Sequence, residues 1–275
     1  MADDLPVFGL TARDLTIGYG GTAILDRVAV AIPEGKITAL VGANGSGKST
    51  LLRTLGRVLD PLGGTVLLDG RDIAAMPRRA LARALALLPQ APISPDGLTV
   101  RELCSFGRHP HRGVLTRSTP HDEQVVDEAI AAAGLHDLED RPLDRLSGGQ
   151  RQRAWIAMAL AQETPVLLLD EPTTYLDIAH QLAVLDLLRE LNRDRGRTVV
   201  MVLHDLNQAA QYADHIIAVA DRGIHSTGTP RDLLTPALVK DVFGIDCVII
   251  RHPIDGTPLC LPVSNGNATA ALPQP

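Results

Sequence analysis

The chain has few lysines, cysteines and aromatic residues, and no long hydrophobic run. Of its 26 basic residues only Lys36, Lys48 and Lys240 are lysines. The net charge of −6 argues against bulk electrostatic binding to nucleic acid. No apolar run reaches the ~18 residues needed to cross a bilayer, and the first residues, MADDLPVF, lack the basic segment of a secretion signal. We therefore expect any membrane association to occur through a partner.

The three cysteines, Cys104, Cys247 and Cys260, are scattered along the sequence. Their spacing matches no metal-binding motif and their odd number leaves one unpaired, which favours a reducing compartment. With 275 residues, 45% of them hydrophobic and 21% charged, the chain is long enough for one large domain with a sizeable core. These features predict a cytosolic protein.

Short apolar segments alternate with helical patterns along most of the chain. Residues 10–70 contain strand patterns separated by turns, and residues 48–59 have leucines at helical spacing. Residues 91–162 are mainly helical in pattern. The apolar runs 166–170 and 198–205 flank an amphipathic helix, which is typical of a parallel sheet covered on both faces.

Residues 42–49, GANGSGKS, fit the pattern G-x-x-x-x-G-K-S/T directly after an apolar strand and at the start of a helix. In such a loop the glycines allow the backbone to surround the β- and γ-phosphates, the lysine neutralises them, and the serine hydroxyl ligates Mg²⁺. We therefore expect a nucleotide site here. Its contacts are expected from Gly42, Asn44, Gly45, Ser46, Gly47, Lys48, Ser49 and Thr50.

Two further strands end in polar residues that suit this site. The run VLLLDEP contains Asp170 and Glu171, and VVMVLH ends in His204. Because ligands bind at the carboxyl ends of strands in open α/β sheets, we expect these side chains near the phosphates. Asp170 would hold Mg²⁺ directly or through water. Glu171 would orient and deprotonate the attacking water, and His204 would hydrogen-bond the γ-phosphate.

A second anion-binding pattern, LSGGQ, contains no lysine. Ser147, Gly148 and Gly149 stand at the start of a predicted helix, where exposed N–H groups and the helix dipole favour an anion. One interpretation is that this helix start caps the γ-phosphate of a nucleotide held by another copy of the chain. The other is an ordinary helix cap, with Ser147 and Gln150 as a capping box. The spacing alone leaves both open.

Together, the phosphate loop, LSGGQ and LLLDEP resemble the nucleotide-binding subunits of ATP-binding cassette (ABC) transporters over nearly the whole chain. The resemblance implies an α/β fold of the P-loop NTPase (RecA-like) type. It implies a mainly parallel core sheet, an N-terminal antiparallel β subdomain and an inserted α-helical subdomain over about 91–162. A single domain is expected over 10–262, with a C-terminal extension over about 229–262 and a disordered tail over 263–275.

The resemblance also implies roles for individual residues. A group of residues completes the ATP site of a partner copy across a head-to-tail dimer: Ser147, Gly148, Gly149, Gln150 and Asp177. Tyr19 matches an aromatic residue that stacks on adenine. Gln90, in LLPQAP, matches a glutamine that contacts Mg²⁺ and moves with the membrane partner. Tyr175 departs from the family pattern, which has small residues before the Leu-Asp pair of TTYLD.

Three segments resemble one subgroup, the ATPases of importers of ferric siderophores, haem and cobalamin. They are GRHPHRG (107–113), TTYLDIAHQ (173–181) and the C-terminal TPALVKDVFGIDCVI with GTPLCLP. A ferric siderophore is the preferred cargo, with cobalamin and haem as alternatives. The implied partners are a second copy of the chain, transmembrane permease subunits and, indirectly, a substrate-binding protein, without nucleic acid. The implied location is the cytoplasmic face of the cell membrane.

Other P-loop proteins fit the motifs less well. A kinase or GTPase would leave LSGGQ and His204 without a role, and the guanine motif N-K-x-D is absent. Exporter ATPases are often fused to membrane helices. A non-transport ABC ATPase acting on ribosomes or DNA, the remaining alternative, would carry a second cassette or long coiled coils.

The loop 107–113 contains His109 and His111 without a neighbouring carboxylate, which argues against a closed metal site. With Arg108 and Arg112 it is predicted to be a solvated surface that faces a partner. Trp155, in contrast, is predicted to belong to the core.

Overall fold

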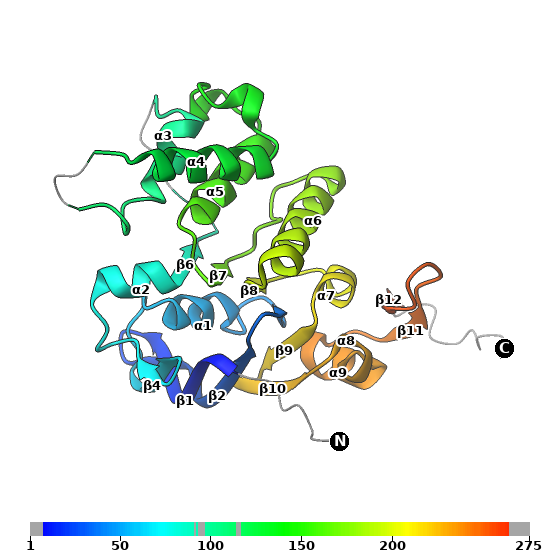
Figure 1. The fold of residues 1–275 in the computed structure, drawn as a ribbon. Helices are drawn as coiled ribbons and strands as arrows, with labels where there is room; N and C mark the ends of the chain where they lie inside the picture. Colours follow the sequence, from blue (N-terminus) through cyan, green and yellow to red (C-terminus); the bar gives the residue numbers. More distant parts are fainter. Residues whose placement is uncertain (1–7, 91, 93–96, 114–116, 264–275) are drawn as a thin grey trace, which may run out of the picture.

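The computed structural model describes residues 8–90, 92, 97–113 and 117–263. Two sheets are stacked in layers, with a helical lobe on one side and a small C-terminal unit on the other (Figure 1). Most of the tail that we expect to be disordered, from residue 264 on, lies outside the described residues. None of the helices in the described ranges combines the length and the apolar character that crossing a bilayer requires.

The N-terminal sheet is antiparallel, with the strand order β2-β1-β4-β5. Its strands are β1 (Phe8–Tyr19), β2 (Thr22–Pro33), β4 (Gly63–Leu68) and β5 (Arg71–Asp72). The turn between β1 and β2 is formed by Gly20 and Gly21, whose φ angles of 57° and 79° favour glycine. The predicted antiparallel β subdomain is confirmed.

The core sheet has the strand order β10-β9-β3-β8-β7-β6. Its strands are β10 (Gly223–Gly228), β9 (His215–Ala220), β3 (Ile37–Val41), β8 (Thr198–Val202), β7 (Val166–Leu169) and β6 (Leu85–Leu88). Strands β9 to β6 run parallel, and β10 pairs with β9 in the antiparallel sense. The carboxyl ends of β3, β8 and β7 therefore meet at one edge of the sheet.

Side chains of β3 alternate between two hydrophobic cores, because neighbouring residues of a strand point to opposite faces. Ile37 and Val41 pack with the helical lobe and α6 (Ile178–Arg195). Leu40 packs with α1 (Lys48–Leu55) and the N-terminal sheet. This double burial explains the continuous apolar runs in the sequence, and it confirms the predicted parallel sheet.

Helix α1 is shorter than the sequence predicts. It ends at Leu55 instead of near residue 59, because Gly56 forms the C-cap and Arg57 has a left-handed φ of 54°. Val58, which follows the end of the helix, is 66% exposed. A second short helix, α2 (Arg78–Ala84), directly precedes β6.

The helical lobe consists of α3 (Val100–Phe106), α4 (Pro120–Ala132) and α5 (Gly148–Ala161), with 3-10 turns at His136–Leu138 and Leu143–Arg145. In Figure 1 it is the green part of the chain. Each of the three α-helices begins with a capping box, in which a Ser or Thr at the N-cap pairs with the third helical residue. Trp155 is buried, as predicted.

The C-terminal unit contains α8 (Pro230–Leu233), α9 (Pro236–Phe243) and the hairpin β11 (Cys247–Arg251) with β12 (Pro258–Pro262). Both helices start at Thr-Pro pairs, in which Thr is the N-cap and Pro the first helical residue, and Gly244, with φ 72°, ends α9. The hairpin is fixed to α7 (Leu206–Tyr212) by Asn207, whose side-chain amide pairs with the backbone N–H and carbonyl of Cys260. The end of the chain is thus attached to a helix of the core.

The loop 107–113 is only in part the solvated surface that the sequence predicts: His109 and Gly113 are exposed, whereas Arg108 is buried. Arg108 is 2% exposed, and its guanidinium donates to Asp122 Oδ1 at 2.9 Å and to Glu163 Oε2 at 2.7 Å. The ring of His111 bonds the carbonyl at the end of α5. For Arg108 the prediction is wrong, because the carboxylates that bury its guanidinium are distant in the sequence. Within the described part of the chain no group of three or more His, Cys, Asp or Glu side chains is arranged to hold a metal ion.

Candidate functional site

The loop between β3 and α1 forms one wall of a cleft of about 900 Å³. Gly42 has a φ of 152°, and a Cβ added there would lie 2.2 Å from the carbonyl oxygen of Val219 on β9. Gly47 has a φ of 102°, and a Cβ there would lie 2.9 Å from Ile24 of β2. Glycine at these two positions therefore lets the loop curl tightly between the two sheets.

Lys48 lies inside this loop and is 5% exposed. Its Nζ donates to the carbonyl oxygens of Gly42 at 2.9 Å and Ala43 at 2.8 Å. Burial lowers the pKa of Lys48, and the carboxylates of Glu171 and Asp170 raise it in part. This buried ammonium donates hydrogen bonds to neutral carbonyl oxygens only. The charged oxygens of a phosphate would accept stronger hydrogen bonds from it.

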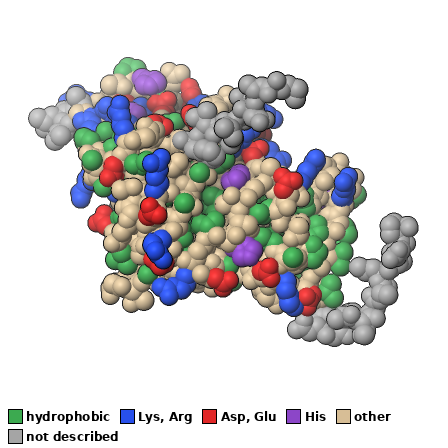
Figure 2. Space-filling view, turned by 90° about the horizontal axis from the view of Figure 1, so that it is seen from below, with side chains coloured by type: hydrophobic (Ala, Val, Ile, Leu, Met, Phe, Trp, Pro, Cys, Tyr) green, Lys and Arg blue, Asp and Glu red, His purple; other side chains and the backbone are tan. Residues whose placement is uncertain are grey.

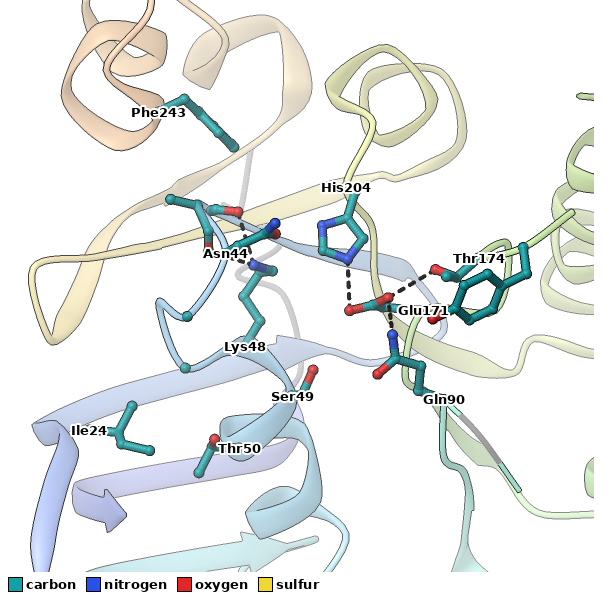
Figure 3. Close-up of a pocket in the computed structure, with 15 residues that line it drawn as sticks. Ile24, Asn44, Lys48, Ser49, Thr50, Gln90, Glu171, Thr174, His204 and Phe243 are labelled. Carbon is teal, nitrogen blue, oxygen red and sulfur yellow. Dashed lines mark hydrogen bonds and ion pairs between the residues drawn. The ribbon is translucent and has the colours of Figure 1, made fainter. Parts of the chain in front are cut away.

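Glu171 follows β7 and lies across the cleft from Lys48 (Figure 3). Three side chains contact its carboxylate: His204 Nε2 lies 2.7 Å from Oε1, Gln90 Nε2 donates to Oε2 at 2.5 Å, and Thr174 Oγ1 donates to Oε2 at 2.9 Å. The backbone at Glu171 is left-handed, with φ 53°, which is uncommon for a residue other than glycine. This arrangement holds a carboxylate in one orientation, where it can accept a proton from a water in the cleft.

Asp170 is buried next to the cleft, and neither of its carboxylate oxygens has a hydrogen-bond partner among the described residues. The guanidinium of Arg53 lies 3.3 Å from Oδ2. An ionised carboxylate is costly to bury in this way. Carboxylate, hydroxyl and amide oxygens are preferred ligands of Mg²⁺, so Asp170, together with Ser49 and Gln90, which line the cleft, fits a divalent cation.

The cleft brings together many of the residues predicted to bind ATP. It is lined by the predicted Gly42, Asn44, Gly45, Gly47, Lys48, Ser49, Thr50, Gln90, Glu171 and His204. It is also lined by residues that the sequence did not suggest: Ile24, Ala43, Thr174, Tyr175 and Phe243. Thr174 could have been found from its place in the DEPTT segment. Ile24 and Phe243 come from distant elements, β2 and α9, and carry no motif.

Tyr19 lies at the end of β1, is 51% exposed and does not line the cleft. Its stacking on adenine stays a prediction.

The LSGGQ segment also lies outside the cleft. Ser147 Oγ accepts from the Gln150 N–H at 3.2 Å, and Gln150 Oε1 accepts from the Ser147 N–H at 3.0 Å. Ser147 and Gln150 thus form the capping box that the sequence allows.

Gly149 packs against the ring of His180, so closely that an added Cβ would lie 2.7 Å from its Cδ2. His180 Nδ1 lies 2.6 Å from Asp177 Oδ1, and hydrogen bonds from the backbone and ring of His180 lower the pKa of Asp177. Gly149 and Asp177, both predicted to act on a partner's nucleotide, thus lie close together in one chain.

A glycine-rich loop with a buried lysine, set between a parallel strand and a helix and facing carboxylates at the end of a neighbouring strand, defines a P-loop nucleotide-binding protein. The model of the ABC transporter family matches residues 25–174, a range that contains the phosphate loop, LSGGQ and LLLDEP. The chain belongs to the ABC transporter family, in which it is an ATP-binding subunit that hydrolyses ATP.

Two relatives are similar to this chain over most of their own length. The achromobactin transport ATP-binding protein CbrD of Dickeya dadantii (strain 3937) is 53% identical over 253 residues, which are 92% of this chain and 94% of that protein. The ferric enterobactin transport ATP-binding protein FepC of Escherichia coli (strain K12) is 49% identical over 254 residues, which are 92% of this chain and 94% of that protein. The predicted resemblance to ABC ATPases is confirmed.

Solved structures confirm the fold class. A chain of an ABC transporter in an inward-facing conformation has a TM-score of 0.82 and 28% identity, covering 94% of this chain and 98% of that one. A dimeric bacterial ABC transporter cassette has a TM-score of 0.72 and 29% identity, and the match covers 80% of this chain and 98% of that one. The same cassette has been solved as a dimer in a post-hydrolysis state bound to ADP and Pi, with a TM-score of 0.70 and 28% identity.

Proposed function

We propose that this chain powers the import of ferric siderophores as the ATPase subunit of an ABC importer. The observation that carries the proposal is its similarity to CbrD and FepC, which are named for the transport of achromobactin and ferric enterobactin, over more than nine tenths of the chain. In this proposal the cargo is recognised by the permease and the substrate-binding protein. The ATPase supplies the driving force and does not contact the cargo.

Within the cleft, the phosphates of ATP occupy the loop 42–50, and Lys48 exchanges its carbonyl acceptors for oxygens of the β- and γ-phosphates. His204 hydrogen-bonds the γ-phosphate, and Glu171 takes a proton from the attacking water. Tyr19 stacks on adenine. Mg²⁺, when bound, neutralises charge on the transferring phosphate. It would be held by Ser49, Gln90 and Asp170.

A second copy of the chain completes each site in this proposal. Its LSGGQ helix start caps the γ-phosphate through Ser147, Gly148, Gly149 and Gln150, and its Asp177 approaches the phosphate loop. The dimeric state of the similar cassette and the contact between Gly149 and His180 support this arrangement. ATP favours the closed dimer through contacts that exist only there, and loss of the γ-phosphate reopens it.

The chain would act as a single domain over 10–262, with a helical subdomain over about 91–162 and a C-terminal extension over about 229–262. It would lie at the cytoplasmic face of the membrane, held there by permease subunits and linked through them to a substrate-binding protein. A role on nucleic acid has little support, because acidic and basic side chains are interspersed over the described part of the face in Figure 2.

The test is uptake of radiolabelled ferric siderophores, haem and cobalamin by cells that lack the gene. The cells are complemented with the parent protein or with Lys48→Ala. We expect ferric-siderophore uptake to be lost and to be restored only by the parent. Loss of haem or cobalamin uptake in its place would keep the ATPase role and change the cargo. Normal uptake of all three would refute the importer role.

A further inference from the structure

Two glutamines connect the turn after Glu171 to the helix after His204. Gln208 Nε2, on α7, donates to Gln181 Oε1, on α6, at 2.8 Å. Gln181 Nε2 in turn donates to the carbonyl oxygen of Thr173 at 3.3 Å and to that of Leu176 at 3.1 Å. One amide therefore joins the turn 173–176 to α7, and all of these bonds are partly buried.

The turn needs such support. Glu171 and Tyr175 both have left-handed backbones, with φ 53° and 64°, and such conformations persist only where the surroundings hold them. The backbone bonds inside the turn are long, at 3.2 Å from the Thr174 N–H to the Glu171 carbonyl and 3.4 Å from the Leu176 N–H to the Thr173 carbonyl. The two hydrogen bonds from the Gln181 side-chain amide tie this turn to α6.

The other end of the link reaches His204. Asp205 is the N-cap of α7, and its Oδ1 accepts from the backbone N–H groups of Asn207 at 2.7 Å and Gln208 at 3.1 Å. His204 directly precedes this cap, so a displacement of Gln208 displaces His204. Because His204 Nε2 lies 2.7 Å from Glu171 Oε1, the contacts form a closed ring through α7, the two glutamines and the turn.

We propose that Gln181 and Gln208 are positioning residues that set the geometry between Glu171 and His204. The proposal rests on the catalytic roles assigned to those two residues above. The ring also includes the start of α6, where the Gln181 N–H bonds the Asp177 carbonyl at 2.9 Å. A movement of Asp177 against a partner copy is thereby passed to Glu171 and His204 in the same chain. The two glutamines thus couple dimer closure to hydrolysis.

The first test is Gln181→Met and Gln208→Met, which keep the length of the side chain and remove its amide. We expect kcat for ATP hydrolysis to fall roughly 10- to 100-fold, because small displacements of catalytic groups have effects of this size. ATP affinity should be unchanged, since neither residue lines the cleft. The double variant should be no slower than the slower single variant, because both break one ring. Parental kcat in both single variants would overturn the proposal.

Gln208→Met leaves the bonds from Gln181 to the turn in place, so it tests the link to α7 without removing the support of the turn. Gln181→Glu keeps the acceptor for Gln208 and removes the donors to the turn. Each variant should lower kcat, because each opens the ring at one point.

The matched control is Tyr212→Phe. Tyr212 Oη donates to Asp186 Oδ1 at 2.9 Å and so joins the same two helices, at the end of α7 away from His204. We expect it to lower the melting temperature about as much as the glutamine variants do, with kcat unchanged. If Tyr212→Phe lowers kcat to the same extent, loosening of α7 on α6 explains the result and the proposal is wrong.

Glu171→Gln separates failure of this inference from failure of the proposed function. If Glu171→Gln hydrolyses ATP at the parental rate, the catalytic role of Glu171 is wrong, and with it the premise of the inference. If Glu171→Gln is inactive and both Gln181→Met and Gln208→Met retain the parental kcat, only the positioning role is wrong. We expect Gln181→Met to leave the residual rate of Glu171→Gln unchanged.

Discussion

At the scale of single residues, the Glu171 carboxylate contacts the side chains of His204, Gln90 and Thr174. Glu171→Gln keeps the size of the side chain and removes its capacity to accept a proton. We expect hydrolysis to slow by roughly 10²- to 10⁴-fold, the usual contribution of a general base. ATP binding should persist, and ATP-bound dimers should accumulate.

Phosphate release measures the first effect, and size-exclusion chromatography with ATP measures the second. Lys48→Ala is the matched control, because it should lose nucleotide binding and dimer formation together. Parental hydrolysis by Glu171→Gln would assign the proton acceptor to another group.

At the scale of elements, the two glycines that begin α5 differ in their surroundings. A Cβ at Gly149 would lie 2.7 Å from the His180 ring, whereas a Cβ at Gly148 would meet nothing within 4 Å. We expect Gly149→Ala to lower the free energy of unfolding by about 1–3 kcal/mol through crowding. Gly148→Ala should raise it by about 0.5–1 kcal/mol, because alanine loses less conformational entropy in a helix. Urea unfolding without nucleotide gives both values, and equal effects would contradict the close packing of Gly149.

The elements also show what the sequence could predict. The starts of α5, α8 and α9 were predictable, because Ser or Thr caps act within three residues of sequence. The end of α1 was not, since Arg57 adopts a left-handed backbone after a glycine in an apolar pattern that reads as continuous helix. Lys48 and Glu171 were found because each belongs to a contiguous motif at a strand end. Phe243 and the partners of Arg108 depend on contacts between distant segments, which no local pattern contains.

At the scale of the whole molecule, the proposed composite site can be tested by mixing two defective chains. In the Glu171→Gln background, Lys48→Ala damages the phosphate loop and Gly149→Ala damages the LSGGQ segment. A mixed dimer has one site in which both contributions are intact. We expect the mixture to retain labelled ATP and to dimerise, while each variant alone does neither. Failure of the mixture would contradict a site shared between two chains.

The buried cluster around Arg108 joins α4 to the end of α5, so it determines how the helical lobe is held together. Burial raises the pKa of Asp122, but hydrogen bonds from Thr119 and Arg108 outweigh it and hold this pKa well below its usual range. A carboxyl whose pKa is lower in the folded than in the unfolded state stabilises the fold at pH values above its unfolded pKa of ~4. This stabilisation is lost as the pH falls further. We therefore expect the unfolding free energy of the parent to drop more steeply below about pH 4 than that of Asp122→Asn.

At neutral pH, Asp122→Asn should cost about 3–5 kcal/mol, because it removes one partner of a buried ion pair. Chemical denaturation over a pH series measures both effects. The control is Asp127→Asn, since Asp127 pairs with Arg101 on the surface and its side chain is 57% exposed. Equal pH dependence in the parent and in Asp122→Asn would refute the role of this carboxyl.

Phe243 lies on α9 and lines the nucleotide cleft, far in the sequence from the phosphate loop (Figure 3). Docking of α9 and occupancy of the cleft are therefore thermodynamically linked, and the linkage is reciprocal. If nucleotide protects the C-terminal unit from protease, then a change that secures α9 tightens nucleotide binding by the same factor. A cassette shortened before α8 would lose a wall of its own active site.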